Sequence, residues 1–180
     1  MIKVGKEIGV ENFSAVGMDV QGVIANPVCT EFSTAAGFHK TGDLEKGMEL
    51  VRHCQRIIKE ARPVWWVIEN PANGRLKDFL GKPIITYQPW WYGSPWTKKT
   101  ALWGEFDIPA RLFHSWDDVA KNPKLYVRPG RGKPSLAFLH KSAIYDIPEF
   151  AWAIPLVRED NAFRSLCSQG FAKCFKAVNK

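Results

Sequence analysis

The sequence predicts an α/β fold built around a parallel pair of strands. Two short apolar runs, at residues 23–25 and 64–68, each end in polar residues and a proline, as buried strands do. Residues 44–61 lie between them and carry apolar side chains at helical spacing. A strand, a helix and a second strand in this order form one α/β step, so both strands are expected to end at the same edge of one sheet.

The first clear strand covers residues 18–24, and Asn26-Pro27 breaks the chain after it. Proline cannot donate to a ladder and pushes the preceding residue out of the helical region. Cys29 then stands on a turn just past the carboxyl end of a strand, where α/β sheets place their ligands. The alternative for Cys29 is a small buried apolar side chain, which is the usual role of a free cysteine.

A helix is predicted from Asp43, a suitable N-cap, to about Ala61, with Pro63 ending it. The next strand ends at Glu69, which would share a crevice with Cys29 if the two strands are parallel neighbours. A thiol beside a carboxyl that can hold or give a proton is an arrangement for covalent catalysis. Taken alone, Glu69 would be a cap or first-turn acid of the following helix.

Later elements are predicted to be short. Residues 76–80 form a short helix ended by glycine, and residues 84–87 and 101–103 are candidate strands. From residue 107 onward six prolines divide the chain into short pieces. Residues 159–178 are predicted to close the chain as a helix.

The composition indicates a globular protein with a polyanionic partner. The chain has 180 residues, 46% of them hydrophobic, and a net charge of +7. Eight tryptophans are present, and several adjoin lysine or arginine, a pattern suited to bases and phosphates of DNA. Inward-pointing aromatics beneath a basic solvated surface are the alternative explanation.

Other features narrow the class of protein. No apolar run approaches the roughly 20 residues of a membrane span, and no signal peptide is recognisable, so we expect a cytoplasmic protein without membrane contact. The four cysteines form no Cys-x-x-Cys pair, which argues against a zinc site and a disulfide framework. We therefore expect no metal.

Four segments resemble DNA cytosine-5 methyltransferases or their phage-encoded relatives. Residues 26–33, Asn-Pro-Val-Cys-Thr-Glu-Phe-Ser, resemble the Pro-Pro-Cys-x-x-Phe-Ser loop of that family. Glu69-Asn70-Pro71 resembles the Glu-Asn-Val element, in a form associated with phage members, and residues 92–100 look like the Tyr-Gly-x-Pro-Gln-x-Arg-x-Arg segment. Residues 163–172 are similar to the end of phage methylase-like proteins. The order and compatible spacing make the resemblance specific.

The resemblance implies a partial Rossmann-like methyltransferase sheet with helices on its faces and a Pro-rich irregular C-terminal part. We expect one domain over residues 1–180, with a methyltransferase-like catalytic core at residues 18–104 and a C-terminal extension at residues 105–180 that includes the final helix. The implied setting is the cytoplasm of a prokaryotic or phage-infected host cell.

The implied activity is that of a DNA (cytosine-5-)-methyltransferase. Cys29 would attack C6 of a flipped cytosine, Glu69 would stabilise the ring at N3, and Lys98 would orient the ring or a phosphate. A methyl group would then be added at C5. We expect further DNA contacts from the family segments and from the basic loop at residues 128–133: Asn26, Pro27, Thr30, Ser33, Asn70, Pro71, Trp96, Lys99, Arg128 and Arg131.

The methyl donor is the main departure from the family. S-adenosylmethionine is the expected cofactor, but the family's Phe-x-Gly-x-Gly donor loop is not visible in this sequence. Three explanations fit the missing donor loop. The protein is a truncated or degenerate methylase, or one chain of a two-chain enzyme whose second polypeptide supplies the donor-binding half, or an enzyme of C5 chemistry with another donor.

Two other classes of protein stay open. One is a catalytically inactive nucleic-acid-binding or anti-restriction relative. The other is a pyrimidine-nucleotide C5-modifying enzyme, which would use the same attack of cysteine on C6 but would not need a basic, Trp-rich face.

Overall fold

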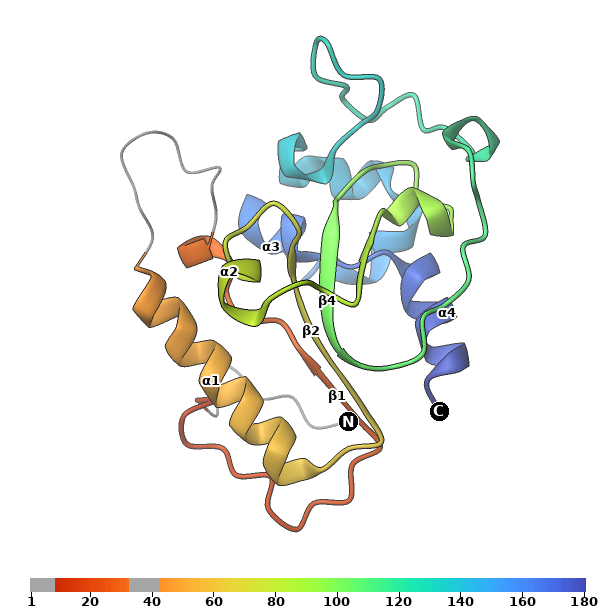
Figure 1. The fold of residues 1–180 in the computed structure, drawn as a ribbon. Helices are drawn as coiled ribbons and strands as arrows, with labels where there is room; N and C mark the ends of the chain where they lie inside the picture. Colours follow the sequence, from red (N-terminus) through yellow and green to blue (C-terminus); the bar gives the residue numbers. More distant parts are fainter. Residues whose placement is uncertain (1–8, 33–42) are drawn as a thin grey trace. The chain divides into compact units, whose positions relative to one another are not determined.

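The computed structural model describes residues 9–32 and 43–180 (Figure 1). The chain divides into two compact units. Unit 1 comprises Met1–Thr86 and Thr100–Phe106, and unit 2 comprises Tyr87–Lys99 and Asp107–Lys180. The fold is mixed α/β with one four-stranded sheet, as the sequence predicts.

The sheet has the strand order β1-β2-β4-β3. Its strands are β1 (Gly22–Ala25), β2 (Trp65–Pro71), β4 (Thr100–Glu105) and β3 (Ile85–Tyr87). β1 and β2 are parallel, which confirms the predicted α/β step, whereas β4 runs antiparallel to β2. The sheet is therefore mixed, consistent with a partial Rossmann-like fold. The first strand is shorter than predicted and begins at Gly22, not at residue 18.

Helix α1 (Leu44–Ala61) covers one face of this sheet and lies along β1 and β2 (Figure 1). As predicted, Asp43 caps it by accepting a hydrogen bond from the Lys46 N–H at 3.0 Å. Its buried side chains pack with those of β1, β2 and β4 in one cluster: Ala25, Phe32, Val51, Ile58, Ile68, Leu76, Ala101 and Trp103. A short helix, α2 (Lys77–Leu80), follows β2 at the predicted place.

One partly buried carboxylate, that of Glu60, joins the segment before β1 to α1. The Ala15 N–H donates to Glu60 at 2.9 Å, and Arg56 donates to the same carboxyl at 2.7 Å. The Ala15 hydrogen bond, followed by Arg56, holds the pKa of Glu60 below its usual value.

Unit 2 contains five short 3₁₀ helices, in keeping with its prolines. These are η2 (Pro89–Tyr92), η3 (Trp116–Asp118), η4 (Leu136–Phe138), η5 (Lys141–Asp146) and η6 (Pro148–Ala153). They enclose a core with an aromatic centre: Trp96, Leu125, Leu136, Leu139, Ile144, Ile147, Phe150, Ala153 and Phe163.

Residues 159–178 were predicted to form one helix, but they form two, so the prediction of a continuous helix was wrong. α3 (Asp160–Ser165) ends before α4 (Gln169–Val178) begins. Ser168 causes the break, because its buried hydroxyl accepts from the Phe171 N–H at 3.3 Å as an N-cap and pairs with the Ser94 hydroxyl at 2.8 Å.

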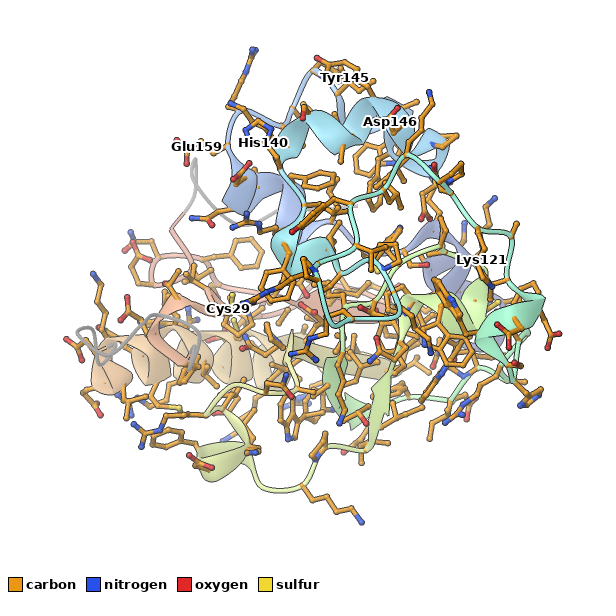
Figure 2. The ribbon with its side chains drawn as sticks, turned by 90° about the horizontal axis from the view of Figure 1, so that it is seen from above. Cys29, Lys121, His140, Tyr145, Asp146 and Glu159 are labelled. Carbon is orange, nitrogen blue, oxygen red and sulfur yellow. The ribbon has the colours of Figure 1, made fainter. Side chains whose placement is uncertain are left out.

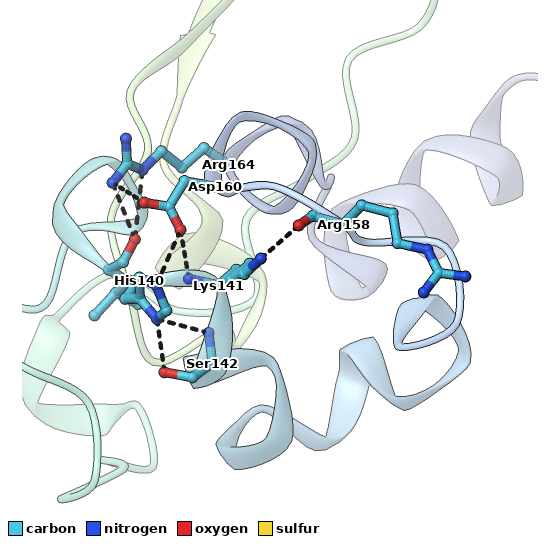
Figure 3. A network of polar contacts seen from close by, with 7 residues as sticks. His140, Lys141, Ser142, Arg158, Asp160 and Arg164 are labelled. Atoms are coloured by element: carbon cyan, nitrogen blue, oxygen red, sulfur yellow. Dashed lines mark hydrogen bonds and ion pairs between the residues drawn. The ribbon is translucent and has the colours of Figure 1, made fainter.

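A network of polar contacts fixes the start of α3 (Figure 3). Asp160 accepts from the Lys141 N–H at 2.8 Å and from Arg164 at 3.2 Å, and lies 3.8 Å from His140. The Lys141 hydrogen bond is the main reason that the pKa of Asp160 lies below its usual value.

Candidate active site

The carboxyl ends of β1 and β2 meet at one edge of the sheet. Ala25, the last residue of β1, pairs with Ile68, so the residues after Ala25 leave the sheet beside the last three residues of β2. Asn26 is the first residue after β1, whereas Glu69 lies within β2, which continues to Pro71 beside β4. A parallel pair that ends in this way is where open α/β sheets present ligand-binding groups.

The segment from Asn26 to Phe32, here called the thiol loop, is tied to β2 by one buried hydrogen bond. The Asn70 side-chain amide donates to the Pro27 carbonyl at 3.0 Å. Asn70 is 1% exposed and Pro27 is also buried, so water does not compete for this contact. The bond joins two of the segments in which the sequence resembles a methyltransferase. Cys29, two residues beyond Pro27, is half-buried (Figure 2).

Phe32 anchors the other end of the thiol loop. Its side chain is fully buried and its ring packs edge-on against Phe79, with centroids 6.2 Å apart. The Phe32 carbonyl accepts from the Arg75 N–H at 2.9 Å. A Cβ at Gly47 of α1 would lie 2.8 Å from the Phe32 ring, so a glycine is required for this close packing. The loop that bears Cys29 is therefore held at both ends.

Glu31 is an anchor that the sequence analysis missed. Its carboxyl accepts from the Asp43 N–H at 2.7 Å and so connects η1 (Thr30–Phe32) to the cap of α1. The signal was present, because an acid near the unsatisfied N–H groups of a helix start is favourable. It was hidden by the intervening residues 33–42, which separate the two partners in sequence.

Glu69 and Asn70 point to opposite faces of β2. Side chains alternate along a strand, and Ile68 packs in the cluster that α1 covers. Asn70 shares that face, while Glu69 shares the other face with Val67. Glu69 is half-buried and pairs with Leu102 of β4. The structure thus gives Asn70 a structural contact and leaves Glu69 on a different face of the strand.

The side-chain oxygen of Asn70, Oδ1, is buried and has no hydrogen-bond partner among residues 9–32 and 43–180. A buried amide usually satisfies both ends, since an unmade hydrogen bond costs about 1–3 kcal/mol. The hydrogen bond that this side chain makes is therefore the one in which its amide N–H donates to the Pro27 carbonyl.

The remaining thiol-loop and strand-end positions are more open. Asn26 and Thr30 are exposed, and Pro71 is half-buried. Ser33 lies outside the described residues. Whether these side chains contact DNA stays a prediction.

The other predicted site residues belong to unit 2. The Lys98 ammonium donates to the Ser165 and Leu166 carbonyls, both at 3.3 Å, at the end of α3. A lysine near the last carbonyls of a helix is favourable there. Lys99 is exposed.

Trp96 lies in the core of unit 2. Its ring is fully buried, and its indole N–H donates to Glu149 at 3.1 Å. Stacking of a base on this ring would require the core to open. The family position that suggested a DNA contact is thus filled by a packing residue in this chain.

Arg128 and Arg131 are exposed in the basic loop. The Arg128 guanidinium lies 4.9 Å from the centre of the Phe138 ring, and its carbonyl accepts from the Arg131 N–H at 3.0 Å. Gly130 takes a positive φ of 77° to complete this turn. Both guanidinium groups remain accessible for the predicted phosphate contacts.

The described strands offer no glycine loop for S-adenosylmethionine. The glycine that follows β2 before α2 is Gly74, and a Cβ there would lie 3.2 Å from the Pro71 carbonyl and 3.3 Å from the Phe32 carbonyl. The Gly74 and Arg75 N–H groups donate to the Pro71 and Phe32 carbonyls at 3.0 and 2.9 Å, so this turn does not offer them to an anion such as the carboxylate of S-adenosylmethionine. Among the residues described, the turn at Gly74 therefore does not fit the donor.

Two absences hold for the described ranges, residues 9–32 and 43–180. No three His, Cys, Asp or Glu side chains gather there closely enough to hold a metal ion. None of the helices in these ranges combines the length and apolar character that crossing a bilayer needs.

Comparison with known proteins points to the class that the thiol loop resembles. The chain is similar to a protein of Frog virus 3 (isolate Goorha) that is named as a probable DNA (cytosine-5)-methyltransferase. The two are 30% identical over 102 residues, and the match covers 47% of this chain. It covers 46% of the viral protein, so the chain spans about half the length of that relative. No protein-family model matches the chain. The partial similarity supports a methyltransferase-like protein.

Proposed function

We propose that this protein is a DNA cytosine-5 methyltransferase-like enzyme that activates the cytosine ring through Cys29. The hydrogen bond from Asn70 to Pro27 carries the proposal, because it joins the thiol loop to the strand that bears Glu69. The parallel pairing of β1 and β2 adds that both segments leave the sheet at one edge. The viral relative supports the choice of cytosine C5 as the reacting position.

The chemistry needs a thiolate because cytosine C5 is a poor nucleophile. Addition of the Cys29 sulfur to C6 would turn the ring into an enamine whose electron density lies at C5. Glu69 would donate a proton or hydrogen bond at N3, where that addition places negative charge. The base would have to leave the duplex to reach the sulfur.

Lys98 would take part only by exchanging its present contacts. Its ammonium donates to two carbonyls at 3.3 Å, and a ring or phosphate would have to replace them. As a point charge, lysine would orient a phosphate less strictly than the bidentate arginine of the family.

Methylation at C5 would require S-adenosylmethionine from the solution or from a second polypeptide. Because Gly74 is packed against the chain's own carbonyls, the proposal for the residues described ends at ring activation. A catalytically inactive DNA-binding relative is the second candidate, and this same packing is the observation that favours it.

Covalent trapping tests the proposal without depending on the donor. A duplex pool, randomised around one 2-pyrimidinone in place of cytosine, accepts a thiolate at C6 without methyl transfer. We expect a denaturant-stable adduct with the wild-type chain and none with Cys29→Ser. Cys167→Ser, which removes an exposed thiol of unit 2, is the matched control and should trap as the wild type does.

Two results would overturn ring activation by Cys29. One is an adduct that persists in Cys29→Ser. The other is no adduct at alkaline pH with S-adenosylmethionine supplied, which would favour the inactive relative. Trapping by the free nucleotide but not by DNA would instead indicate the nucleotide-modifying class.

A further inference from the structure

The net charge of this protein resides in unit 2. Unit 1 has 11 lysines and arginines and 11 aspartates and glutamates, so its formal charge is zero. Unit 2 has 14 basic and 7 acidic residues, which accounts for the whole charge of +7. An affinity for polyanions is therefore expected of unit 2 in particular.

Three tryptophans of unit 2 gather with three cations. The Trp90 ring packs edge-on against Trp91 and Trp116, with centroids 6.1 and 6.2 Å apart. Lys133 lies 4.8 Å from the centre of Trp90 and 5.2 Å from that of Trp116. This group, here called the tryptophan cluster, consists of Trp90, Trp91, Trp116, Arg111, Lys121 and Lys133.

The backbone brings the other two cations to the rings. The Leu112 and Phe113 N–H groups both donate to the Trp91 carbonyl at 3.0 Å, and the Arg111 guanidinium stacks 3.2 Å from the centre of the Trp91 ring. Lys121 donates to the Val119 carbonyl at 2.8 Å and lies 4.6 Å from the centre of Trp116. The cluster is therefore held in place by η2, η3 and the segments beside them.

The cations of the cluster are not neutralised by carboxylates. Among the residues described, the ion pairs of unit 2 involve Lys124, His140 and Arg164, and none joins a cluster cation to an acid. Asp117 and Asp118 adjoin Trp116 in sequence but form no ion pair with these cations. An aromatic face attracts a cation without cancelling its charge, so the positive potential remains for a ligand.

The side chains suit unpaired nucleotides better than other anions. Half-buried indole rings offer flat surfaces for bases, and the lysines and arginine beside them suit the phosphates between those bases. A duplex hides its base faces, so the rings would add little there. Rings that insert into a membrane protrude from the surface, whereas Trp90, Trp91 and Trp116 are all half-buried.

We infer that the tryptophan cluster is a binding surface for single-stranded nucleic acid. Lys133 belongs to the same basic loop as Arg128 and Arg131, which extend the charge along the chain. Lys121 lies on the opposite side of unit 2 from His140 and Glu159 (Figure 2), so the polar network at α3 is a separate feature. The inference depends on rings and charges of unit 2 and not on Cys29 chemistry.

Binding of a fluorescent 20-nucleotide oligothymidylate to the full chain tests the inference. We expect the affinity to fall as salt rises, with a slope reduced by about 0.7 in Lys133→Gln, one phosphate contact on a single strand. Trp116→Leu should weaken binding about tenfold or more through lost stacking. The matched controls are Lys124→Gln, which removes an ion-paired lysine, and Trp152→Leu, which removes an exposed ring of η6. Both should bind as the wild type does.

Photo-cross-linking gives a second readout that needs no variant. An oligonucleotide containing bromodeoxyuridine should cross-link to the peptides that contain residues 90–91 and 116. The inference would be overturned if the cluster and control variants lost affinity equally, or if cross-links formed only elsewhere in the chain. It would also be overturned if the protein bound a duplex, heparin or anionic phosphatidylserine vesicles as tightly as the oligothymidylate. The outcome is independent of adduct formation at Cys29.

Discussion

The two units separate the groups proposed to react from the net charge. Unit 1 is electrically balanced, and it holds Cys29 and Glu69 at the ends of regular parallel strands. Unit 2 has few residues in regular elements, yet it carries the whole net charge and the tryptophan cluster. The difference teaches that a strand pair suits groups whose position must be fixed, while short turns suit a surface whose charge must be accessible.

The largest expected effect comes from the anchor of the thiol loop. Phe32→Ala should lower the free energy of unfolding of unit 1 by about 3–5 kcal/mol, because it leaves a cavity where a fully buried ring packed. Hydrogen exchange in increasing urea would assign the loss to a unit. Phe138→Ala, which removes a more exposed ring of unit 2, should cost about 0.5 kcal/mol. Equal losses in the two variants would break the comparison.

The next effect concerns the Glu69 carboxyl of unit 1. Glu69→Gln should reduce trapping by more than about tenfold, since a charge-stabilising contact in the transition state contributes a few kcal/mol. Binding to the oligothymidylate should not change, because that surface belongs to unit 2. Glu105→Gln, an exposed acid on β4, is the control for lost charge. If Glu69→Gln lowers stability and trapping together, Glu69 is a structural residue.

Two buried asparagines allow the same substitution in each unit. Asn70→Ala removes the bond to Pro27 and should cost about 1–3 kcal/mol of stability and slow trapping. Asn179 of unit 2 bonds to Asp107 and Phe175, so Asn179→Ala should lower stability and leave trapping unchanged. Chemical denaturation and adduct yield would be measured on both. Faster or unchanged trapping in Asn70→Ala would contradict the anchoring role.

The smallest effect is a pH dependence that both units share. The pKa values of Glu60 and Asp160 are lowered in the folded protein, so each carboxylate stabilises above its ordinary pKa. That contribution is lost as the pH falls through the lowered pKa. Glu60→Gln and Asp160→Asn should each lower the melting temperature at neutral pH and flatten its fall below about pH 4. A steeper acid dependence in either variant would contradict the assignment.

Local sequence signals predicted unit 1 better than unit 2. The cap at Asp43, the stop at Pro63 and the apolar spacing between them defined α1 within a residue. Short-range patterns were sufficient because each of these interactions lies within one turn of the helix. The antiparallel direction of β4 could not be derived in this way, since strand pairing depends on distant partners.

Unit 2 shows where such reasoning fails. Trp96 lies two and three residues before Lys98 and Lys99 and was predicted to contact DNA, whereas the structure buries its ring beside Glu149. The tryptophans that do lie among cations, Trp90 and Trp116, meet Lys133 only through the tertiary fold. The sequence therefore predicted a surface of tryptophans and cations, but it did not indicate which tryptophans form that surface.

The three-dimensional structure was also needed to tell the residues proposed to react from those that hold the thiol loop in place. Asn70 was expected to contact substrate, but its amide donor is engaged at Pro27. Glu31 was not singled out, although it fixes the thiol loop to Asp43. Both assignments depend on partners 43 and 12 residues away in the chain.

The alternation of side chains along β2 limits what a sequence motif can show about such a site. Gly104 opposes Val67 with a φ of 152°, and a Cβ there would lie 2.0 Å from the Trp66 carbonyl, so the two strands approach closely at this pair. Inserting one residue between positions 65 and 68 would leave Glu-Asn-Pro spelled as before. It would nevertheless turn the carboxyl toward α1 and the amide away from Pro27. A motif search would still find Glu-Asn-Pro in that chain, although Glu69 and Asn70 would have exchanged faces of the strand.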